Sequence, residues 1–387
     1  MIGMSAVIFI PDDTAKTGYP QPLMLQSVMG APLLAWLANA LFDSGVGRFF
    51  LVCHDRYVEA ARACLPAEAE VMTTMDSDPA DLLHVFLSTA EDAEHTITVV
   101  TGPAVYLPQL APQAAGRFPR VYGVSREELM QALDEHFSFA RFLLDNGSPM
   151  NEEQAMYSVA SPAELPEIAG LLQRNRLLAL ARTGVEIYDA SSCYVEPSVR
   201  VAPGARLLPG TMLRGKTVIG EEAVIGPWSV IDDSVIGARA VVNASQVRES
   251  RVGQDAVVGP YASVRGGCEL GRSVRAGSFV ELKNARLGEN TQVPHLAYLP
   301  DTEAGANCNF GCGVTTANFD RVQKHETVVG EGAFIGCNTA LIAPLQVGSG
   351  AYIGAGSTIT EDVPAQALGI ARARQSNKKE WAAKHKK

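Results

Sequence analysis

Residues 329–359 read VGEGAFIGCNTALIAPLQVGSGAYIGAGSTI, and an aliphatic side chain recurs at every sixth position from Val329 to Ile359. Neither the 3.6-residue period of a helix nor the two-residue period of a strand gives this spacing. A period of six arises when each hexad is one short strand and a turn, so that successive hexads form the sides of a prism. The stretch therefore predicts a left-handed parallel β-helix of hexapeptide repeats, with the aliphatic anchors pointing inward.

The same spacing fills most of the second half of the chain. Anchors lie six apart from Val195 to Ile231 and again from Val252 to Leu282, with occasional steps of five between runs. Glycine often follows an anchor, as in Ile335-Gly336. It suits a corner where a side chain would collide or where φ must be positive. Repetition over so many hexads makes a chance match implausible.

The first half of the chain has a different pattern. The short apolar runs SAVIFI, RFFLVC and TITVVTG alternate with amphipathic stretches, which predicts an α/β domain with a mostly parallel sheet over residues 1–155. Residues 156–184 are expected to form a linker helix with Ser161 as its N-cap. The β-helix is expected over residues 185–368, and residues 369–387 form a basic C-terminal arm.

Composition limits the possible partners and compartment. The formal net charge of −10 argues against nucleic acid or an anionic membrane as the main partner. The seven cysteines include no CxxC pair, so a disulfide framework and a Cys-rich zinc site are both disfavoured. The N-terminal apolar run is short and has no basic flank, so a signal peptide is not expected, and no apolar run approaches the ~18 residues of a membrane helix. A cytoplasmic protein is expected.

Chemistry is expected where the hexads are interrupted. The stretch ANFDRVQKHET at residues 317–327 lies between an expected anchor at Gly311 and the run that begins at Val329. A loop of this length has to project from its coil, and projecting loops on rigid scaffolds often carry functional sites. His295 falls between the anchors Val293 and Leu299, so we expect it on the outer surface.

Two cations and this histidine suggest the kind of chemistry. Arg265 and Lys283 are eighteen residues apart, so they stack on coils of three hexads and repel each other unless an anion is present. This pattern favours a phosphate-bearing ligand. His295 is a reasonable general base because an unperturbed imidazole has a pKa of ~6.5. Only His295 and His325 occur in the expected β-helix, residues 185–368, so a metal site is not expected.

Several longer stretches carry a more specific resemblance. GPYASVRGG, FVELKNARLG, PHLAYLPD, GANCNFGCG and TTANFD resemble the acetyltransferase half of the bifunctional N-acetylglucosamine-1-phosphate uridylyltransferase/glucosamine-1-phosphate acetyltransferase family, over roughly residues 185–380. The resemblance implies transfer of acetyl from acetyl-CoA to the 2-amino group of glucosamine 1-phosphate, a step toward UDP-N-acetylglucosamine and cell-envelope precursors. It also implies a homotrimer.

The resemblance implies individual roles as well. His295 resembles the base that removes the amine proton, and the backbone N–H at Cys312 lies where it would stabilise the oxyanion. The sugar-phosphate positions are Arg265, Lys283, Tyr298, Asn309 and Lys324. The acetyl-CoA positions are Cys312, Asn318, Phe319, Cys337, Ala355 and Arg372. Phe319 replaces a usual tyrosine and Cys337 a usual serine, so each weakens or removes a hydrogen bond to the donor.

The N-terminal half resembles the uridylyltransferase half much less. The family's LAAGxGTRM loop is replaced by IPDDTAKTGYP, its PK pair reads Pro22-Leu23, and the turn for the metal-binding aspartate reads Thr101-Gly102-Pro103. We expect a reduced nucleotidyltransferase-like domain that has lost uridylyl transfer. Two alternatives stay open: acetylation of another amino sugar or nucleotide sugar, and a non-catalytic sugar-nucleotide-binding protein. The intact His295, Arg265 and Lys283 speak against the second.

Overall fold

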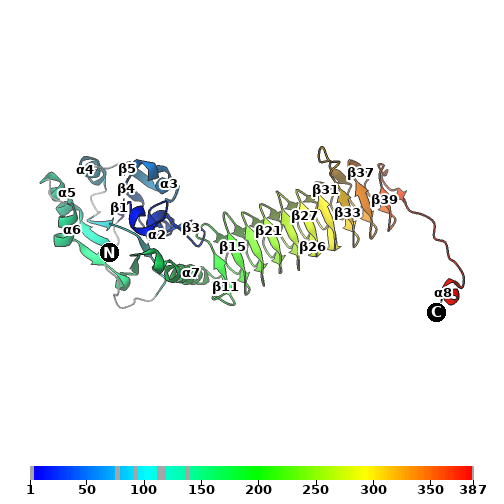
Figure 1. The fold of residues 1–387 in the computed structure, drawn as a ribbon, viewed down its shortest axis with the longest axis horizontal. Coiled ribbons are helices and arrows are strands. Elements are labelled where there is room, and N and C mark those ends of the chain that lie inside the picture. The colour runs from blue at the N-terminus through cyan, green and yellow to red at the C-terminus, as the bar shows by residue number, and fades with distance from the viewer. Residues whose placement is uncertain (1–3, 75–78, 91–94, 111–118, 136–138, 386–387) are drawn as a thin grey trace. The chain divides into compact units, whose positions relative to one another are not determined.

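The computed structural model describes residues 4–74, 79–90, 95–110, 119–135 and 139–385 (Figure 1). The chain divides into two compact units, of which the first comprises Met1–Arg182 with Val195–Pro197. The second comprises Thr183–Tyr194 with Ser198–Lys387. No helix in the described ranges combines the length and the apolar character needed to cross a membrane.

A six-stranded sheet forms the centre of the first unit, in the order β5-β4-β1-β6-β8-β9. Its parallel strands are β1 (Ser5–Ile10), β4 (Arg48–Cys53), β5 (Glu70–Thr74) and β6 (Thr96–Val100). The edge strands β8 (Val121–Ser125) and β9 (Ser148–Met150) run antiparallel to their neighbours. The three expected strands and the mostly parallel α/β sheet are confirmed.

Helices cover both faces of this sheet because successive strand residues point to opposite sides. Ala6 and Ile8 of β1 pack with Leu37 of α2 (Leu33–Asp43), on the face that also carries α3 (Val58–Arg62). Val7 packs on the other face with Phe86 of α4. That face carries α4 (Ala80–Ser88), α5 (Arg126–Asp134) and α6 (Phe139–Asn146). The shorter elements are α1 (Thr14–Thr17), β2 (Ser27–Val28) and β3 (Ala31–Pro32).

The helix expected at residues 156–184 is shorter and belongs to the first unit. Met156–Ser158 form strand β10, which pairs antiparallel with β7 (Ala104–Tyr106). Ser161 precedes a 3-10 turn and makes no side-chain capping bond, and helix α7 spans Leu165–Arg182. Ile168 and Leu172 of α7 are buried against Leu23 and Trp36. The helix is therefore part of a core and does not stand free as a linker.

Three parallel sheets form the second unit, and each coil contributes one strand to each sheet in turn (Figure 1). The first sheet contains β11 (Glu186–Ile187), β14 (Arg206–Leu207), β17 (Val224–Ile225), β20 (Val241–Val242), β23 (Val257–Val258), β26 (Arg275–Ser278), β29 (Gln292–His295), β32 (Asn309–Phe310), β35 (Phe334–Ile335), β38 (Tyr352–Ile353) and β40 (Leu368–Gly369). Beyond β40, every residue from Ile370 to His385 is exposed, with one short helix, α8 (Trp381–Lys384).

The second sheet contains β15 (Met212–Arg214), β18 (Val230–Asp232), β21 (Gln246–Arg248), β24 (Ser263–Arg265), β27 (Glu281–Lys283), β30 (Tyr298–Pro300), β33 (Thr315–Ala317), β36 (Ala340–Ile342) and β39 (Thr358–Ile359). Strand β12 (Tyr194–Val195) falls where the chain passes between the two units. The third sheet contains β13 (Arg200–Val201), β16 (Val218–Ile219), β19 (Val235–Ile236), β22 (Arg251–Val252), β25 (Glu269–Leu270), β28 (Arg286–Leu287), β31 (Thr302–Ala304), β34 (Thr327–Val329) and β37 (Leu345–Val347).

Stacked anchors make the core of this β-helix, which confirms the hexapeptide-repeat prediction. Ile335 pairs in register with Ile353, and both are fully buried. Val201, in the first coil, is only partly buried. The glycines after anchors permit close approach of the coils, since a Cβ on Gly336 would lie 2.5 Å from the backbone nitrogen of Ala355.

One anchor differs from the expectation. Gly311 is not an inward position, because Phe310 fills the core there and is fully buried. The reason is a five-residue side between the anchors Leu299 and Ala304, which shifts the following hexads back by one residue. Thr316 is the next inward residue. The expected loop then leaves the coil after Ala317 and returns at Thr327.

Candidate functional site

Five of the predicted site residues form one row along a corner of the β-helix. We call His295, Cys312, Cys337, Ala355 and Arg372 the corner column. His295 ends strand β29, and the other four follow strands β32, β35, β38 and β40 of the first sheet on successive coils. Inter-coil bonds show the stacking: the N–H of Gly313 donates to Leu296 O (2.9 Å), that of Asn338 to Cys312 O (2.8 Å) and that of Gly356 to Cys337 O (2.8 Å).

The backbone geometry of this corner repeats from coil to coil. Leu296, Gly313, Asn338 and Gly356 all have positive φ, at 45°, 78°, 53° and 72°. The residue before each of them is a member of the column, so those four members occupy equivalent positions. Arg372 joins the row because its Cδ lies 3.7 Å from where a Cβ on Gly356 would be. His295, Cys337, Ala355 and Arg372 are exposed, and Cys312 is partly exposed.

Three predicted sugar-phosphate residues lie together on the second sheet. Arg265 and Lys283 are register partners on β24 and β27. Tyr298 on β30 is the register partner of Glu281. The Glu281 carboxylate accepts a hydrogen bond from the Arg265 guanidinium. The expectation of two uncompensated cations is therefore wrong for Arg265, and Glu281 is a residue that the sequence reasoning missed.

Asn309 does not join this group within one chain. It lies on β32 of the first sheet, where its register partners are Gln292 and Phe334. Arg265, Lys283 and Tyr298 lie on the second sheet. The structure thus places Asn309 and the phosphate-binding candidates on different faces of the prism.

The remaining predicted residues lie on the projecting loop, residues 318–326, which is held at both ends by Asp301. The Asn318 side-chain amide donates to Asp301 Oδ2, and that of Asn284 donates to Asp301 Oδ1 at 2.6 Å. The backbone N–H of Thr327 donates to Asp301 O at 3.1 Å. Asp301 thus binds the residue that enters the loop and the residue that leaves it. The sequence reasoning did not identify it.

Inside the loop, Asp320 organises a tight turn. Its carboxylate accepts from the N–H groups of Val322 (2.7 Å) and Gln323 (2.8 Å) and bonds to Nε2 of His325 (2.8 Å). These bonds, led by that of His325, hold the pKa of Asp320 well below its usual value. Phe319 and Lys324 form an antiparallel bridge across the loop. Lys324 is exposed, and the Phe319 side chain is 60% exposed.

The edge of the first unit's sheet where a nucleotide-binding loop was considered does carry charged groups. Asp12 follows β1, Arg56 follows β4, and their side chains form an ion pair. A hydrogen bond from the Thr14 hydroxyl is the main cause that lowers the pKa of Asp12. A carboxylate and a cation are therefore present at this edge of the sheet, and they bond to each other. Among the described residues, no group of three or more His, Cys, Asp or Glu side chains is placed to hold a metal ion.

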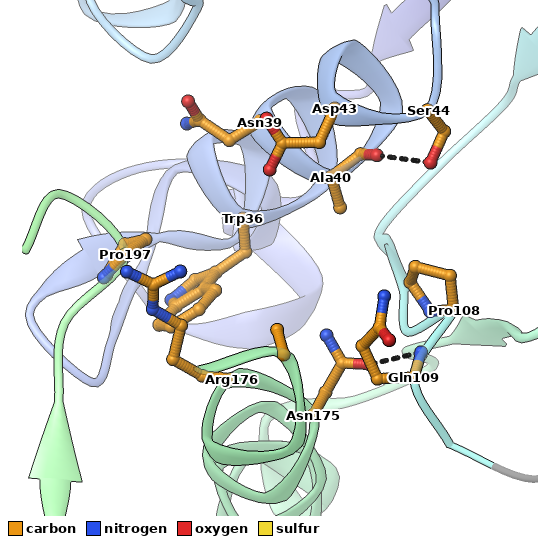
Figure 2. Close-up of a pocket in the computed structure, with 11 residues that line it drawn as sticks. Trp36, Asn39, Ala40, Asp43, Ser44, Pro108, Gln109, Asn175, Arg176 and Pro197 are labelled. Carbon is orange, nitrogen blue, oxygen red and sulfur yellow. Dashed lines mark hydrogen bonds between the residues drawn. The ribbon is translucent and has the colours of Figure 1, made fainter. Parts of the chain in front are cut away.

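The first unit also contains a cavity of about 170 Å³ between α2 and α7 (Figure 2). Asp43 of α2 and Arg176 of α7 face it from opposite sides, and Trp36 lines it. Burial lowers the pKa of the Arg176 guanidinium, while the charge of Asp43 opposes that shift. The Asn175 amide oxygen accepts the N–H of Gln109 at 2.9 Å. None of the predicted site residues lines this cavity.

Comparison with known proteins supports the β-helix assignment and the sequence resemblance. The family described as "Bacterial transferase hexapeptide (six repeats)" matches residues 326–361. The Bifunctional protein GlmU of Clostridium perfringens (strain SM101 / Type A) is 40% identical over 240 residues, which is 62% of this chain and 53% of that protein. The GlmU of Brevibacillus brevis is 44% identical over 221 residues, 57% of this chain and 48% of that protein.

The chain thus spans about half the length of the curated relatives it matches. Likeness to solved structures is slight. The inositol-1-phosphate CTP transferase from T. maritima matches with a TM-score of 0.34 and 13% identity, covering 46% of this chain and 97% of that one. The resemblance found in the sequence is confirmed by the curated relatives.

Proposed function

We propose that this chain, which is similar to the GlmU proteins over about half of their length, transfers acetyl from acetyl-CoA to the 2-amino group of glucosamine 1-phosphate. The observation that carries the proposal is the corner column, in which His295 begins a row that continues through Cys312, Cys337 and Ala355 to Arg372. This row offers a base at one end and a cation at the other. An extended thioester donor would need both, since its reacting carbon and its phosphates lie far apart.

In this proposal His295 acts as the general base. Its imidazole removes a proton from the acceptor ammonium or amine as the nitrogen attacks the thioester carbonyl, and such catalysis typically contributes 10²–10⁴-fold. The negative charge that develops on the carbonyl oxygen is stabilised by the backbone N–H at Cys312. The sulfur of CoA then leaves as the thiol. Cys337 and Ala355 lie along the donor, and Arg372 binds a CoA phosphate.

The acceptor would bind on the adjoining second sheet. Lys283 and Arg265 receive the sugar phosphate, for which two neighbouring cations are well suited. Glu281 holds the guanidinium of Arg265 in place before the phosphate arrives. Tyr298, next to Glu281 in register, contacts the sugar. Selection among amino sugars would depend on the shape of this pocket.

We place the complete site between chains of a homotrimer. Asn309 lies on a different sheet from Lys283 and Tyr298, and Lys324 projects on the loop, so one chain does not bring all of these groups together. A neighbouring chain would supply the missing side of the pocket. Mixing inactive His295→Ala chains with inactive Lys324→Ala chains should then restore part of the activity. Mixed trimers that form but stay inactive would contradict a shared site.

The function is tested by measuring release of CoA thiol from acetyl-CoA with a panel of amino sugars and nucleotide amino sugars. Glucosamine 1-phosphate should be the preferred acceptor, and His295→Ala should remove the activity. A preference for another amine would keep the chemistry and change the acceptor. No acetyl transfer to any amine, by folded protein, would refute the proposal and favour a non-catalytic binding role.

We also propose that uridylyl transfer has been lost. The Gly-rich loop and the PK pair are absent from the sequence, and the Asp12 carboxylate is paired with Arg56. Nucleotidyl transfer with Mg²⁺ needs a carboxylate free to bind the metal and a cation for the leaving pyrophosphate. Purified protein given UTP, Mg²⁺ and N-acetylglucosamine 1-phosphate should therefore release no pyrophosphate. Steady release would show that the first unit has kept this activity.

A further inference from the structure

Two of the seven cysteines differ from the others in exposure. Cys53, Cys64, Cys193, Cys268 and Cys308 are buried, and burial raises the pKa of each of these thiols. Cys312 is partly exposed and Cys337 is exposed. Since thiol oxidation requires access and thiolate character, the five buried thiols are protected. Oxidants reach only the two cysteines of the corner column.

These two cysteines lie directly opposite each other on adjacent coils. They occupy the same position of a repeated pattern, FGCG at 310–313 and IGCN at 335–338, and Phe310 pairs in register with Ile335. Hydrogen bonds flank the pair on both sides: Gly311 N–H donates to Ile335 O, and Asn338 N–H donates to Cys312 O, both at 2.8 Å. Both cysteines are followed by a residue with positive φ, so their Cβ atoms leave the backbone in the same direction.

The spacing suits a covalent bond. Adjacent strands lie about 4.8 Å apart, and disulfides join Cα atoms separated by roughly 4.4–6.8 Å. A Cβ placed on Gly311 would lie 2.6 Å from the backbone nitrogen of Cys337, which shows how closely the two coils approach here. Register partners on parallel strands project their side chains in the same direction, so the two corners must tilt toward each other to bring the Cβ atoms within the roughly 3.5–4.5 Å that a disulfide needs.

We propose that Cys312 and Cys337 react with low-molecular-weight disulfides to form a reversible disulfide bond between each other, and that this bond switches off the acetyl-donor site. The exposed Cys337 thiolate attacks the oxidant, here oxidised glutathione, to give a mixed disulfide and one reduced glutathione. The Cys312 thiolate then displaces the second glutathione. The protein loses two thiol protons and two electrons, and one oxidised glutathione becomes two reduced molecules. The inhibitory part of this inference rests on the proposed function.

Inhibition follows from the place of the bond. The disulfide would lie across the two coils between His295 and Ala355, where the donor thioester is proposed to bind, and it would shift the N–H at Cys312. A displacement of about 1 Å at a reacting centre can reduce the rate on the order of 10²-fold. We expect a loss of that size in the oxidised protein and full recovery with dithiothreitol.

The experiment treats reduced full-length protein with oxidised glutathione and maps tryptic peptides without reduction. Trypsin separates the two cysteines, because Cys312 lies in peptide 287–321 and Cys337 in peptide 325–372. The two peptides should appear linked, also in a Cys308→Ser variant that removes the other cysteine of the first peptide. Acetyl transfer should fall with linkage in wild type, whereas Cys337→Ser, which lacks the attacking thiol, should keep the rate of its own reduced form. Cys312→Ser should form no linked peptides and should instead retain a glutathione adduct on Cys337.

Failure of the disulfide and failure of the proposed function are distinguishable. In folded wild-type protein, the disulfide would be overturned if the two peptides stay unlinked, or if Cys337 keeps a glutathione adduct that Cys312 does not displace. This conclusion does not depend on whether the protein transfers acetyl. Mixing ¹⁵N-labelled with unlabelled protein tests whether the linkage joins two chains, and cross-labelled peptides would overturn it too. Linked peptides that leave the acetyl-transfer rate unchanged would refute the switch. Linked peptides from a protein without acetyl transfer would support the cysteine pair and refute the proposed function.

Discussion

Replacing Asp301 by alanine should release the projecting loop while leaving the β-helix folded. The Asp301 carboxylate accepts hydrogen bonds from the side chains of Asn284 and Asn318, and alanine removes both acceptors. The bond from Thr327 N–H to the Asp301 carbonyl oxygen involves only the backbone and can persist. The entry of the loop is thus untied, and its exit stays attached.

The size of the effect follows from the bond at Asn318. A hydrogen bond to a charged group contributes roughly 1.5–3 kcal/mol. Asp301 is partly exposed, so water compensates for part of the loss and we use the lower end, ~1.5 kcal/mol. Since 1.4 kcal/mol corresponds to a tenfold change in an equilibrium constant, the population of the open loop should rise about tenfold.

Limited trypsin digestion measures this opening without depending on catalysis. Arg321 and Lys324 are both exposed on the loop, and cleavage tracks the open population when opening and closing are fast. Asp301→Ala should therefore be cut in the loop about ten times faster than wild type. Asn284→Ala is the matched control, because it removes the other partner of Asp301 and leaves the Asn318 bond intact. Its cleavage rate should stay close to that of wild type.

Equal cleavage rates for Asp301→Ala and wild type would refute the reasoning, since the loop would then be held without this carboxylate. Equal acceleration in Asn284→Ala would refute it as well, because the effect would come from the coil below the loop. Cleavage at Arg239, far along the prism, reports general loosening of the fold. It should not change in either variant.

Three further predictions concern catalysis, donor binding and pH. His295→Ala should lower turnover by ~10²–10⁴ in folded protein, as measured by CoA thiol release, and near-wild-type turnover would remove His295 from its proposed role. Arg372→Ala should raise the KM for acetyl-CoA and leave that for the sugar phosphate unchanged; an equal rise in both would indicate a structural role for the arm. The pKa of Asp320 in the folded protein lies below its ordinary value of 3.8. The ionised carboxylate therefore stabilises the loop fully above pH 3.8, and this stabilisation is lost as the pH falls through the lower, folded-state pKa. Pepsin cleavage at exposed Phe319 should therefore stay slow near pH 3.8 in wild type and accelerate only at lower pH. The Asp320→Asn variant should be cut rapidly at every pH in this range. Equal cleavage rates for wild type and Asp320→Asn near pH 3.8 would contradict the effect.

The β-helix could be predicted because its determinants are local and repeated. Each hexad supplies its own anchor, so one wrong anchor does not disturb the pattern elsewhere. The error at Gly311 shows the limit. A single five-residue side between Leu299 and Ala304 shifts all following anchors one residue earlier than a strict six-residue period predicts. Only the packing of side chains shows which side of the prism is short. Phe310 is large and apolar, and that character was the available signal for the correct frame.

The positions of the candidate residues were predictable where they share a column and unpredictable where side chains pair across coils. Arg265 and Lys283 stack because of their spacing alone, and the structure keeps them as register partners. The pairing of Arg265 with Glu281 depends on which rotamer reaches across the sheet, which spacing does not specify. Asp301 was missed for the same reason: its partners Asn284 and Asn318 come from the coils before and after it.

In the first half of the chain, the strands could be predicted from the sequence but the packing of the last helix could not. Strands buried on both faces gave clear apolar runs, whereas the role of α7 depended on a contact that no local pattern contains. Ile168 and Leu172 pack against Leu23 and Trp36, which are more than a hundred residues away in sequence. The sequence pattern of a helix with apolar residues on one side is the same whether that side packs against the preceding domain or against the next one. The boundary at residue 156 was misplaced for this reason.

The loop and the corner column depend on each other through register. Between Cys312 and Cys337 the chain takes 25 residues, against 17 between His295 and Cys312, yet the two cysteines still lie opposite each other. This is possible because the chain leaves and re-enters the prism at nearly the same point: Thr327 pairs in register with Thr302, next to Asp301. The extra residues therefore add a projecting loop without rotating the coils that follow. A β-helix can acquire a lysine-bearing loop in this way and still keep His295, Cys312, Cys337 and Ala355 in one row, since register is set by the strands on either side of the insertion and not by its length.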